Sequence, residues 1–342
     1  MINLVIGDVH VTPNELDDCE ALFGLIEETI KEEQPSQITF MGDLYHNHSI
    51  VDVRCIEFWK RWLDRLGKIG GLDKKYFLLV GNHDQVSPTY GYPHALLSHY
   101  RDFHIVVDKP VVGNDGLAYL PYYHDPKEFI VKAQGLAASD PKVHTLFCHQ
   151  TIIGAKFETG FYVKDAVDIG ALPFKHIISG HIHTPQTVGN KVLYVGSPRW
   201  RILSDAGANR YLWIFECTEE RTELKKKIPT GTVCRRIYRY IDSEKERAII
   251  AVPEALRHLA DIRVDVYGSS DYIAKRTIEL KAICGAKCRG FPERTKLSQV
   301  SDIEGIPIAF DRFSSKFESP NKTPLELLRT TVQERLMATA LS

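Results

Sequence analysis

The chain has 342 residues, of which 44% are hydrophobic and 25% are charged, and its formal net charge is −1. These values are ordinary for globular proteins, and the length allows one large domain and a smaller one. No apolar stretch approaches the roughly 20 residues of a membrane helix, so we expect no membrane partner. Seven scattered cysteines and a first segment that leads directly into a strand predict free thiols, no signal peptide and a cytoplasmic location.

The first 200 residues alternate between strand-like and helix-like segments. Apolar positions close to a 3.6-residue period predict helices over 14–33 and 51–66, and short apolar runs between them predict strands. This alternation is typical of an α/β fold with a mainly parallel sheet covered by helices. The predicted strands are Ile2–Ile6, Gln37–Met41, Phe77–Val80, His104–Val107, Leu117–Pro121, His144–Phe147, His176–Ser179, Val192–Val195 and Tyr211–Phe215.

The character of the sequence changes near residue 218. Residues 230–318 predict a smaller α+β domain, with strands at 235–241 and 262–266 and helices at 253–259 and 272–283. Residues 319–342 predict a linker and an amphipathic helix that begins at a capping box, Thr323-Pro324-Leu325-Glu326. Such a helix either folds back on its own domain or docks onto a partner, and the sequence leaves both open.

Charge is unevenly distributed along the chain. Residues 219–342 hold 23 Lys and Arg against 18 Asp and Glu, whereas residues 1–218 hold 20 against 26. A basic part joined to an acidic part is consistent with a phosphate-bearing polymer as substrate. Chance variation in surface charge explains the same numbers, so charge alone does not decide.

Polar side chains come immediately after five of the predicted strands. The stretches are LVIGDVH from residue 4, ITFMGDLYH from residue 38, LLVGNHD from residue 78, TLFCHQ from residue 145 and HIISGHIH from residue 176. A single stretch of this kind favours a turn, but five with compatible side chains predict one site at the sheet edge. Carboxylates, imidazoles and an amide suit Mn, Fe or Zn. The candidate ligands are Asp8, His10, Asp43, Asn82, His149, His181 and His183.

The spacing of these residues suits two metal ions. Asp-x-His at 8 and 10 sends two side chains toward the same side of a strand end, and Asp43 can bridge two ions with its two oxygens. Two such ions can activate water and stabilise a phosphoryl transition state. His83 is left over as a candidate general acid, with Asp84 as the carboxylate that orients it.

The ordered set of motifs resembles the calcineurin-like metallophosphoesterase superfamily over about the first 200 residues. The resemblance implies a four-layered α/β/β/α sandwich and two metal ions, often Mn. It assigns Asp8, His10, Asp43 and His183 to one ion, and Asp43, Asn82, His149 and His181 to the other. It makes His83 the catalytic acid and Asp84 its partner.

Within the superfamily, Gly42-Asp43-Leu44-Tyr45-His46 is similar to the SbcD branch of double-strand-break nucleases, as is the later Gly196-Ser197-Pro198. This resemblance implies a DNA-binding capping domain over 230–318, a terminal helix that docks onto an SbcC-type coiled-coil ATPase, and a homodimer. The length and the stretch Pro198-Arg199-Trp200 look more like bacteriophage members, which would act in the host cytoplasm. His46 either orients DNA or holds a neighbouring ligand by a hydrogen bond.

The sequence therefore predicts a Mn-dependent DNA exonuclease and endonuclease, the catalytic subunit of an SbcCD-like recombination and repair complex. Residues 1–229 would form the nuclease domain. One alternative is a phosphodiesterase acting on cyclic nucleotides or other small molecules, which shares every metal ligand. A second alternative is a scaffold subunit with an inactive site, against which the intact ligand set argues.

Overall fold

The computed structural model describes residues 1–69, 75–87, 90–96 and 104–292, and its main body contains two six-stranded sheets. The first sheet has the order β14-β13-β1-β2-β3-β6. Its strands β1, β2, β3 and β6 are parallel, and β13 and β14 add an antiparallel edge. Its strands are β1 (Ile2–Ile6), β2 (Gln37–Phe40), β3 (Lys75–Leu79), β6 (His104–Val107), β13 (Tyr211–Cys217) and β14 (Thr222–Pro229).

The second sheet has the order β11-β12-β10-β9-β8-β7. Its four central strands are parallel, and the strand at each edge is antiparallel. Its strands are β7 (Val111–Val112), β8 (Leu117–Leu120), β9 (Thr145–His149), β10 (His176–Gly180), β11 (Gln186–Val188) and β12 (Val192–Tyr194). Both sheets are thus mixed, with parallel central strands and antiparallel strands at one edge of the first sheet and at both edges of the second.

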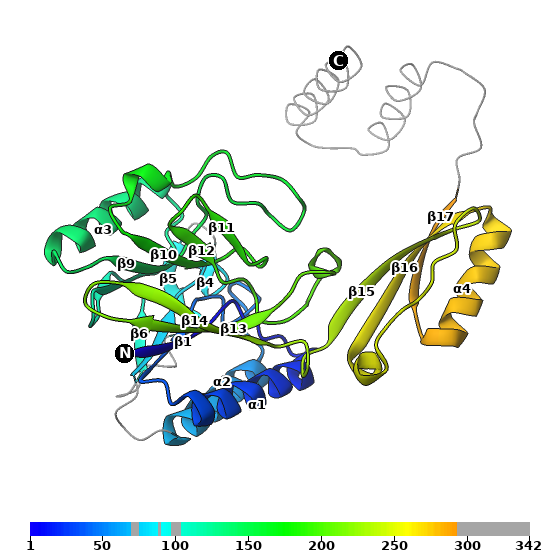
Figure 1. Cartoon of the computed structure of the whole chain (residues 1–342), viewed down its shortest axis with the longest axis horizontal. Helices are drawn as coiled ribbons and strands as arrows, with labels where there is room; N and C mark the ends of the chain where they lie inside the picture. Colours follow the sequence, from blue (N-terminus) through cyan, green and yellow to red (C-terminus); the bar gives the residue numbers. More distant parts are fainter. Residues whose placement is uncertain (70–74, 88–89, 97–103, 293–342) are drawn as a thin grey trace, which may run out of the picture.

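Three apolar clusters hold these layers together. The first sheet packs against α1 (Leu16–Glu33) and α2 (Val53–Ile69) through residues such as Phe23 and Phe40. The second sheet packs against α3 (Pro126–Ser139). Side chains such as Phe77 and Tyr119, whose rings stack 4.2 Å apart, fill the space between the sheets. The layers therefore follow the order helices, sheet, sheet, helix, as Figure 1 shows.

A third sheet stands apart from this body (Figure 1). Its parallel strands are β15 (Arg236–Ser243), β16 (Ala260–Gly268) and β17 (Lys287–Pro292), and helix α4 (Ser270–Cys284) crosses from β16 to β17. Leu280 of α4 packs on Val264 and Val266 of β16. We call residues 236–292 the C-terminal module. The predicted helix at 253–259 is the 3₁₀ helix η4 (Glu254–Leu259).

The remaining elements are short. The hairpin strands β4 (Gln85–Ser87) and β5 (Tyr90–His94) follow β3, and the 3₁₀ helices η2 (Ile169–Ala171) and η3 (Leu203–Asp205) lie in loops. Among the described residues, no helix has the length and apolar character needed to span a bilayer. The predicted terminal helix and residues 293–318 of the predicted second domain lie outside the described residues.

Candidate metal centre

The structure brings the seven predicted ligands together at one edge of the two facing sheets. Each follows or ends a parallel strand, namely β1, β2, β3, β9 or β10. Their ligand atoms form two groups, each with all atoms within 4.8 Å of one another. One group is Asp8, His10 and His183, and the other is Asp43, His149 and His181.

Asn82 completes the second group. Its Oδ1 lies 3.0 Å from His149 Nε2 and 2.8 Å from His181 Nδ1. Asp43 lies between the groups, because its Oδ2 is 3.3 Å from His149 Nε2 and 3.5 Å from His10 Nε2. This placement is what a carboxylate shared by two ions requires.

The first group is built around two facing imidazoles. His10 Nε2 lies 2.9 Å from His183 Nε2. Burial lowers the pKa of both imidazoles, so both are neutral near pH 7. Neutral imidazole is the form that binds a metal ion.

The environment of Asp8 indicates whether these residues fit a bound cation. The Asp8 side chain is fully buried, its Oδ2 accepts a hydrogen bond of 2.7 Å from the His181 amide, and its Oδ1 has no hydrogen-bond partner and lies 3.7 Å from His149 Nδ1. Burial raises the pKa of this carboxyl to about 8. Burying an unpaired carboxylate oxygen is costly, and a bound cation removes that cost. The donor set and this orphaned oxygen therefore fit a divalent metal site.

The backbone of the site is held in an unusual conformation. His10, Asp43 and His181 have positive φ angles of 49°, 49° and 81°. Non-glycine residues rarely adopt this left-handed region, and such strain concentrates at functional sites. The strain directs these side chains toward one point rather than along their strands.

Two glycines in the motifs are required because carboxylate oxygens of the site lie where a Cβ atom would otherwise be. A Cβ at Gly81 would lie 2.2 Å from Asp43 Oδ1, and a Cβ at Gly180 would lie 2.5 Å from Asp8 Oδ1. Atoms at such distances overlap. This is the physical reason for Gly before the polar residues in these stretches of the sequence.

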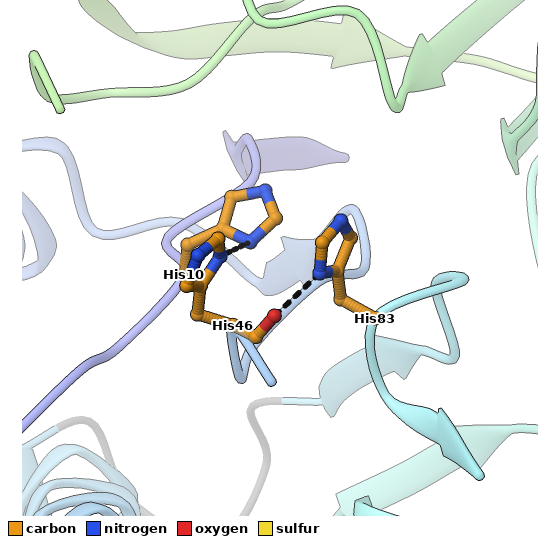
Figure 2. A group of neighbouring side chains, drawn as sticks. All are labelled: His10, His46 and His83. Atoms are coloured by element: carbon orange, nitrogen blue, oxygen red, sulfur yellow. Dashed lines mark hydrogen bonds between the residues drawn. The ribbon is translucent and has the colours of Figure 1, made fainter. Parts of the chain in front are cut away.

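His83 stands at the side of the first group, and Figure 2 shows it with His10 and His46. Its Nδ1 contacts the main-chain carbonyl of His46, and its ring meets the His10 ring edge-on with centroids 4.7 Å apart. The His83 amide donates to Asp43 Oδ1 at 2.8 Å. The ligand atoms of His10, His46 and His83 also form a group within 4.8 Å.

Asp84 does not orient His83 as the sequence analysis expected. Its Oδ1 accepts from the Tyr45 amide and its Oδ2 from the Gly81 amide, both at 3.0 Å. A carboxylate at this turn satisfies two buried amides, so it fixes the loops that carry Asp43 and Asn82. The carbonyl of His46 takes the orienting position instead.

His46 lies between the site and an arginine that the sequence analysis missed. Its Nδ1 is 3.4 Å from His10 Nδ1 and 3.2 Å from a guanidinium nitrogen of Arg201. Burial and the Arg201 charge lower the pKa of His46 to about 4, so this imidazole is neutral at pH 7. Arg201 follows no strand directly, and for that reason the strand-end pattern could not reveal it.

Two other missed residues hold the loops in place. Arg199 is fully buried and donates to the carbonyls of Val9 and His10 at 2.9 and 2.7 Å. Glu158 accepts from the His183 amide at 2.6 Å. The sequence around Arg199 was singled out for its resemblance to a family, whereas nothing in the sequence distinguished Glu158.

The sequence model of the calcineurin-like phosphoesterase family matches residues 3–185. Exonuclease subunit 1 of Enterobacteria phage T4 is 27% identical over 209 residues, which cover 58% of this chain. The match spans 57% of the length of that phage protein.

Two further similarities are more distant. Putative phosphoesterase 244L of Invertebrate iridescent virus 6 is 26% identical over 208 residues, covering 57% of this chain and 68% of the viral protein. The solved structure of GAP50, the anchor in the inner membrane complex of Plasmodium, aligns with a TM-score of 0.45 at 13% identity. That alignment covers 67% of this chain and 84% of GAP50.

Proposed function

Because the chain belongs to the calcineurin-like phosphoesterase family, we propose that it is a Mn-dependent phosphodiesterase that acts on DNA as an exonuclease and endonuclease. The observation that carries the proposal is the convergence of two Asp/His groups around Asp43. The similarity to a phage exonuclease subunit supports DNA as the substrate. The family alone leaves the substrate open, since one fold serves many substrates.

The metal assignment uses all seven converging side chains. Asp8, His10, Asp43 and His183 would hold one ion, and Asp43, Asn82, His149 and His181 would hold the other. The chemistry that two divalent ions supply when bound is activation of water and stabilisation of charge on a phosphoryl group. The mixed oxygen and nitrogen donors suit Mn, although other borderline metals accept the same donors.

His83 is the proposed proton donor to the leaving oxygen. The carbonyl of His46 accepts from its Nδ1, so that nitrogen keeps its hydrogen and the ring is held still. The second ring nitrogen points away from His46 (Figure 2) and is free to carry the transferred proton. A positioned imidazole of this kind contributes about 10²- to 10⁴-fold to the rate.

Arg201 and His46 together would hold a phosphate of the DNA beside the ions. His46 is neutral at pH 7, so the charge that attracts the phosphate comes from Arg201. The guanidinium is also held by Glu15, whose Oε2 lies 3.3 Å from Arg201 Nε. A restrained guanidinium offers its remaining donors to phosphate oxygens at little entropic cost.

The C-terminal module is the proposed start of the DNA-binding cap, which would extend over 230–318. We assign residues 319–342 to docking on an SbcC-type ATPase, by analogy with the branch that the motifs resemble. A homodimer is part of the same proposal. Ile50, which precedes α2, and Val53, its first residue, have exposed fractions of 77% and 76% and would suit that interface.

Hydrolysis assays test this function directly. Purified protein with Mn²⁺ is incubated with linear duplex DNA, single-stranded DNA and a panel of cyclic nucleotides, alongside Asp43→Ala. We expect metal-dependent DNA degradation that the variant lacks. Turnover of cyclic nucleotides with intact DNA would favour a small-molecule phosphodiesterase, and absence of any turnover with no bound Mn would favour a scaffold subunit.

A further inference from the structure

A cavity of about 430 Å³ lies beside the metal centre, between the β4–β5 hairpin, the end of β8 and the start of α3. Its volume falls in the range of small-molecule binding sites, which begins near 300 Å³. Aromatic rings and hydrogen-bond acceptors share its wall. They include Tyr122, Tyr123, His94, Asp108, Asp125 and Glu128.

Tyr122 joins this cavity to the metal centre. Its ring lines the cavity and also stacks on the proposed ligand His181, with centroids 5.7 Å apart and an angle of 25°. The Tyr122 amide bonds to the Val80 carbonyl, and Gln85 donates to the Tyr122 carbonyl at 3.1 Å. These bonds hold the main chain of Tyr122, and its ring lies between the cavity and His181, so a ligand group held at the metals would have the cavity as its neighbour.

His94 lies in the wall of the cavity and contacts Asp108, another residue of that wall. Its side chain is 1% exposed, and its Nε2 lies 3.4 Å from Asp108 Oδ2. Nδ1 is buried and has no hydrogen-bond partner. Burial lowers the pKa of His94, so the ring is neutral and the hydrogen on Nε2 faces Asp108, which leaves a lone pair on Nδ1. The imidazole therefore holds the Asp108 carboxylate at the wall, where 25% of that side chain is exposed.

The charge of the wall limits what can enter. Asp108, Asp125 and Glu128 are carboxylates, which repel a phosphate group but accept hydrogen bonds from an amino group. Tyr122 and Tyr123 offer flat apolar surfaces against which a planar ring can lie. A planar, uncharged ring that bears hydrogen-bond donors satisfies each of these features.

We infer that this cavity is a subsite for the nucleobase next to the phosphate held at the metals, and that it selects bases with an exocyclic amino group. Adenine, cytosine and guanine offer this donor, whereas thymine has only carbonyl oxygens as exocyclic polar groups. The inference rests on the proposed function, because it takes a nucleotide phosphate as the group at the metal centre.

Binding and turnover together test the subsite. Calorimetry of the Mn²⁺-loaded protein is carried out with deoxyadenosine 5′-monophosphate and with thymidine 5′-monophosphate. We expect about tenfold tighter binding of the adenine nucleotide, the effect of one buried hydrogen bond. His94→Phe keeps a ring of similar size but loses the contact with Asp108, so it should reduce the difference, whereas His176→Phe on β10, away from the cavity, should retain it.

A second variant and a substrate without a base distinguish the possible outcomes. Asp125→Asn with Glu128→Gln keeps the helix cap of α3 and should reduce the preference even if His94→Phe fails to fold. Turnover of bis(p-nitrophenyl) phosphate, which has no base, should be unchanged in all these variants. Equal affinity of the wild type for the two nucleotides overturns the subsite. A preserved preference without any diester turnover overturns only the proposed function.

Discussion

At the scale of single residues, the site depends on side chains whose partners are main-chain groups. His149 Nδ1 donates to the Met41 carbonyl at 2.8 Å, which leaves its Nε2 facing Asn82 and Asp43. His83 is fixed in the same way by the His46 carbonyl. A main-chain partner sets both the tautomer and the ring orientation before any ion arrives.

Replacing His83 separates metal binding from chemistry. In His83→Ala we expect the affinity for Mn²⁺ to stay within a few-fold, because the seven proposed ligands remain. DNA turnover should fall by about 10²-fold or more, since the proton donor is lost. Calorimetry measures the first quantity and a nuclease assay the second. A parallel loss of both would make His83 a ligand or a structural residue.

Two glycines should respond in opposite ways to alanine. In Gly180→Ala the added Cβ would lie 2.5 Å from Asp8 Oδ1 and 2.7 Å from the Met41 carbonyl, so the free energy of unfolding should fall by about 1–3 kcal/mol. Gly24 lies within α1, and a Cβ added there would have open space around it. Gly24→Ala should therefore raise the free energy of unfolding by about 0.5–1 kcal/mol. Urea denaturation measures both. Equal tolerance would show that β10 can shift without cost.

At the scale of elements, the sequence revealed what has strong periodicity and missed what lacks it. Helices α1 and α2 bury large side chains at helical spacing, and the parallel strands are apolar runs, so both were predictable. Helix α3 buries only three residues, Phe129, Ala133 and Leu136, so its apolar face is narrow. Strand β14 is an exposed edge strand, and half of its residues are charged. Neither leaves an apolar pattern.

In the site, too, only the residues that belong to a clear sequence pattern could be predicted. The seven proposed ligands could be predicted because parallel strands end at a common edge. The orienting contacts could not, because they join segments far apart in the chain. Arg201 meets His46 from 155 residues away, and Glu158 meets the His183 amide from a loop without regular structure.

In the C-terminal module, one buried ion pair joins the sheet to its helix. Asp242 of β15 is fully buried and accepts from Arg276 at 2.9 and 3.0 Å and from the Tyr272 hydroxyl at 2.7 Å. Asp242→Ala removes the buried partner of Arg276 and leaves it only the pair with the more exposed Glu279, so the free energy of unfolding should fall by about 3 kcal/mol. Denaturation followed by circular dichroism checks this. Glu254→Ala, which removes an exposed pair with Arg257, should change it by less than about 0.5 kcal/mol.

The same pair gives the module a defined response to acid. Burial opposes ionisation of Asp242, but hydrogen bonds from Arg276 and Tyr272 lower its pKa below the usual 3.8. A lowered folded pKa stabilises the protein above the unfolded value, and this contribution is lost as the pH falls through the folded value. The stability difference between wild type and Asp242→Ala should therefore be constant near neutral pH and shrink below about pH 4.

At the scale of the whole molecule, the module is joined to the body by charged contacts. Arg235, just before β15, donates to Glu15 at 2.9 Å, and Glu15 also binds Arg199 and Arg201. Arg201 in turn contacts His46. Displacement of the module would therefore reach the proposed phosphate-binding residues through Glu15.

Removing residues 323–341 tests the proposed division of labour across the chain. We expect the shortened protein to lose association with a coiled-coil ATPase partner and to keep its basal nuclease activity, since the proposed ligands, His83 and the proposed phosphate-binding residues all lie between residues 8 and 201. Size-exclusion chromatography with the partner and a DNA cleavage assay measure the two properties. Aggregation of the shortened protein would show that the segment belongs to a core.

The order of strands in the first sheet has a consequence for how the chain folds. Strand β1 lies between β2 and β13, so Ile2 is paired with Glu216 and the sheet is complete only when both ends of the body have been synthesised. During translation, β1 would expose an open edge while some 200 residues emerge, and open edges invite wrong pairing. Contacts so distant in sequence also slow folding. Fragments that end before β13 should therefore be prone to aggregate, although they contain all seven proposed ligands.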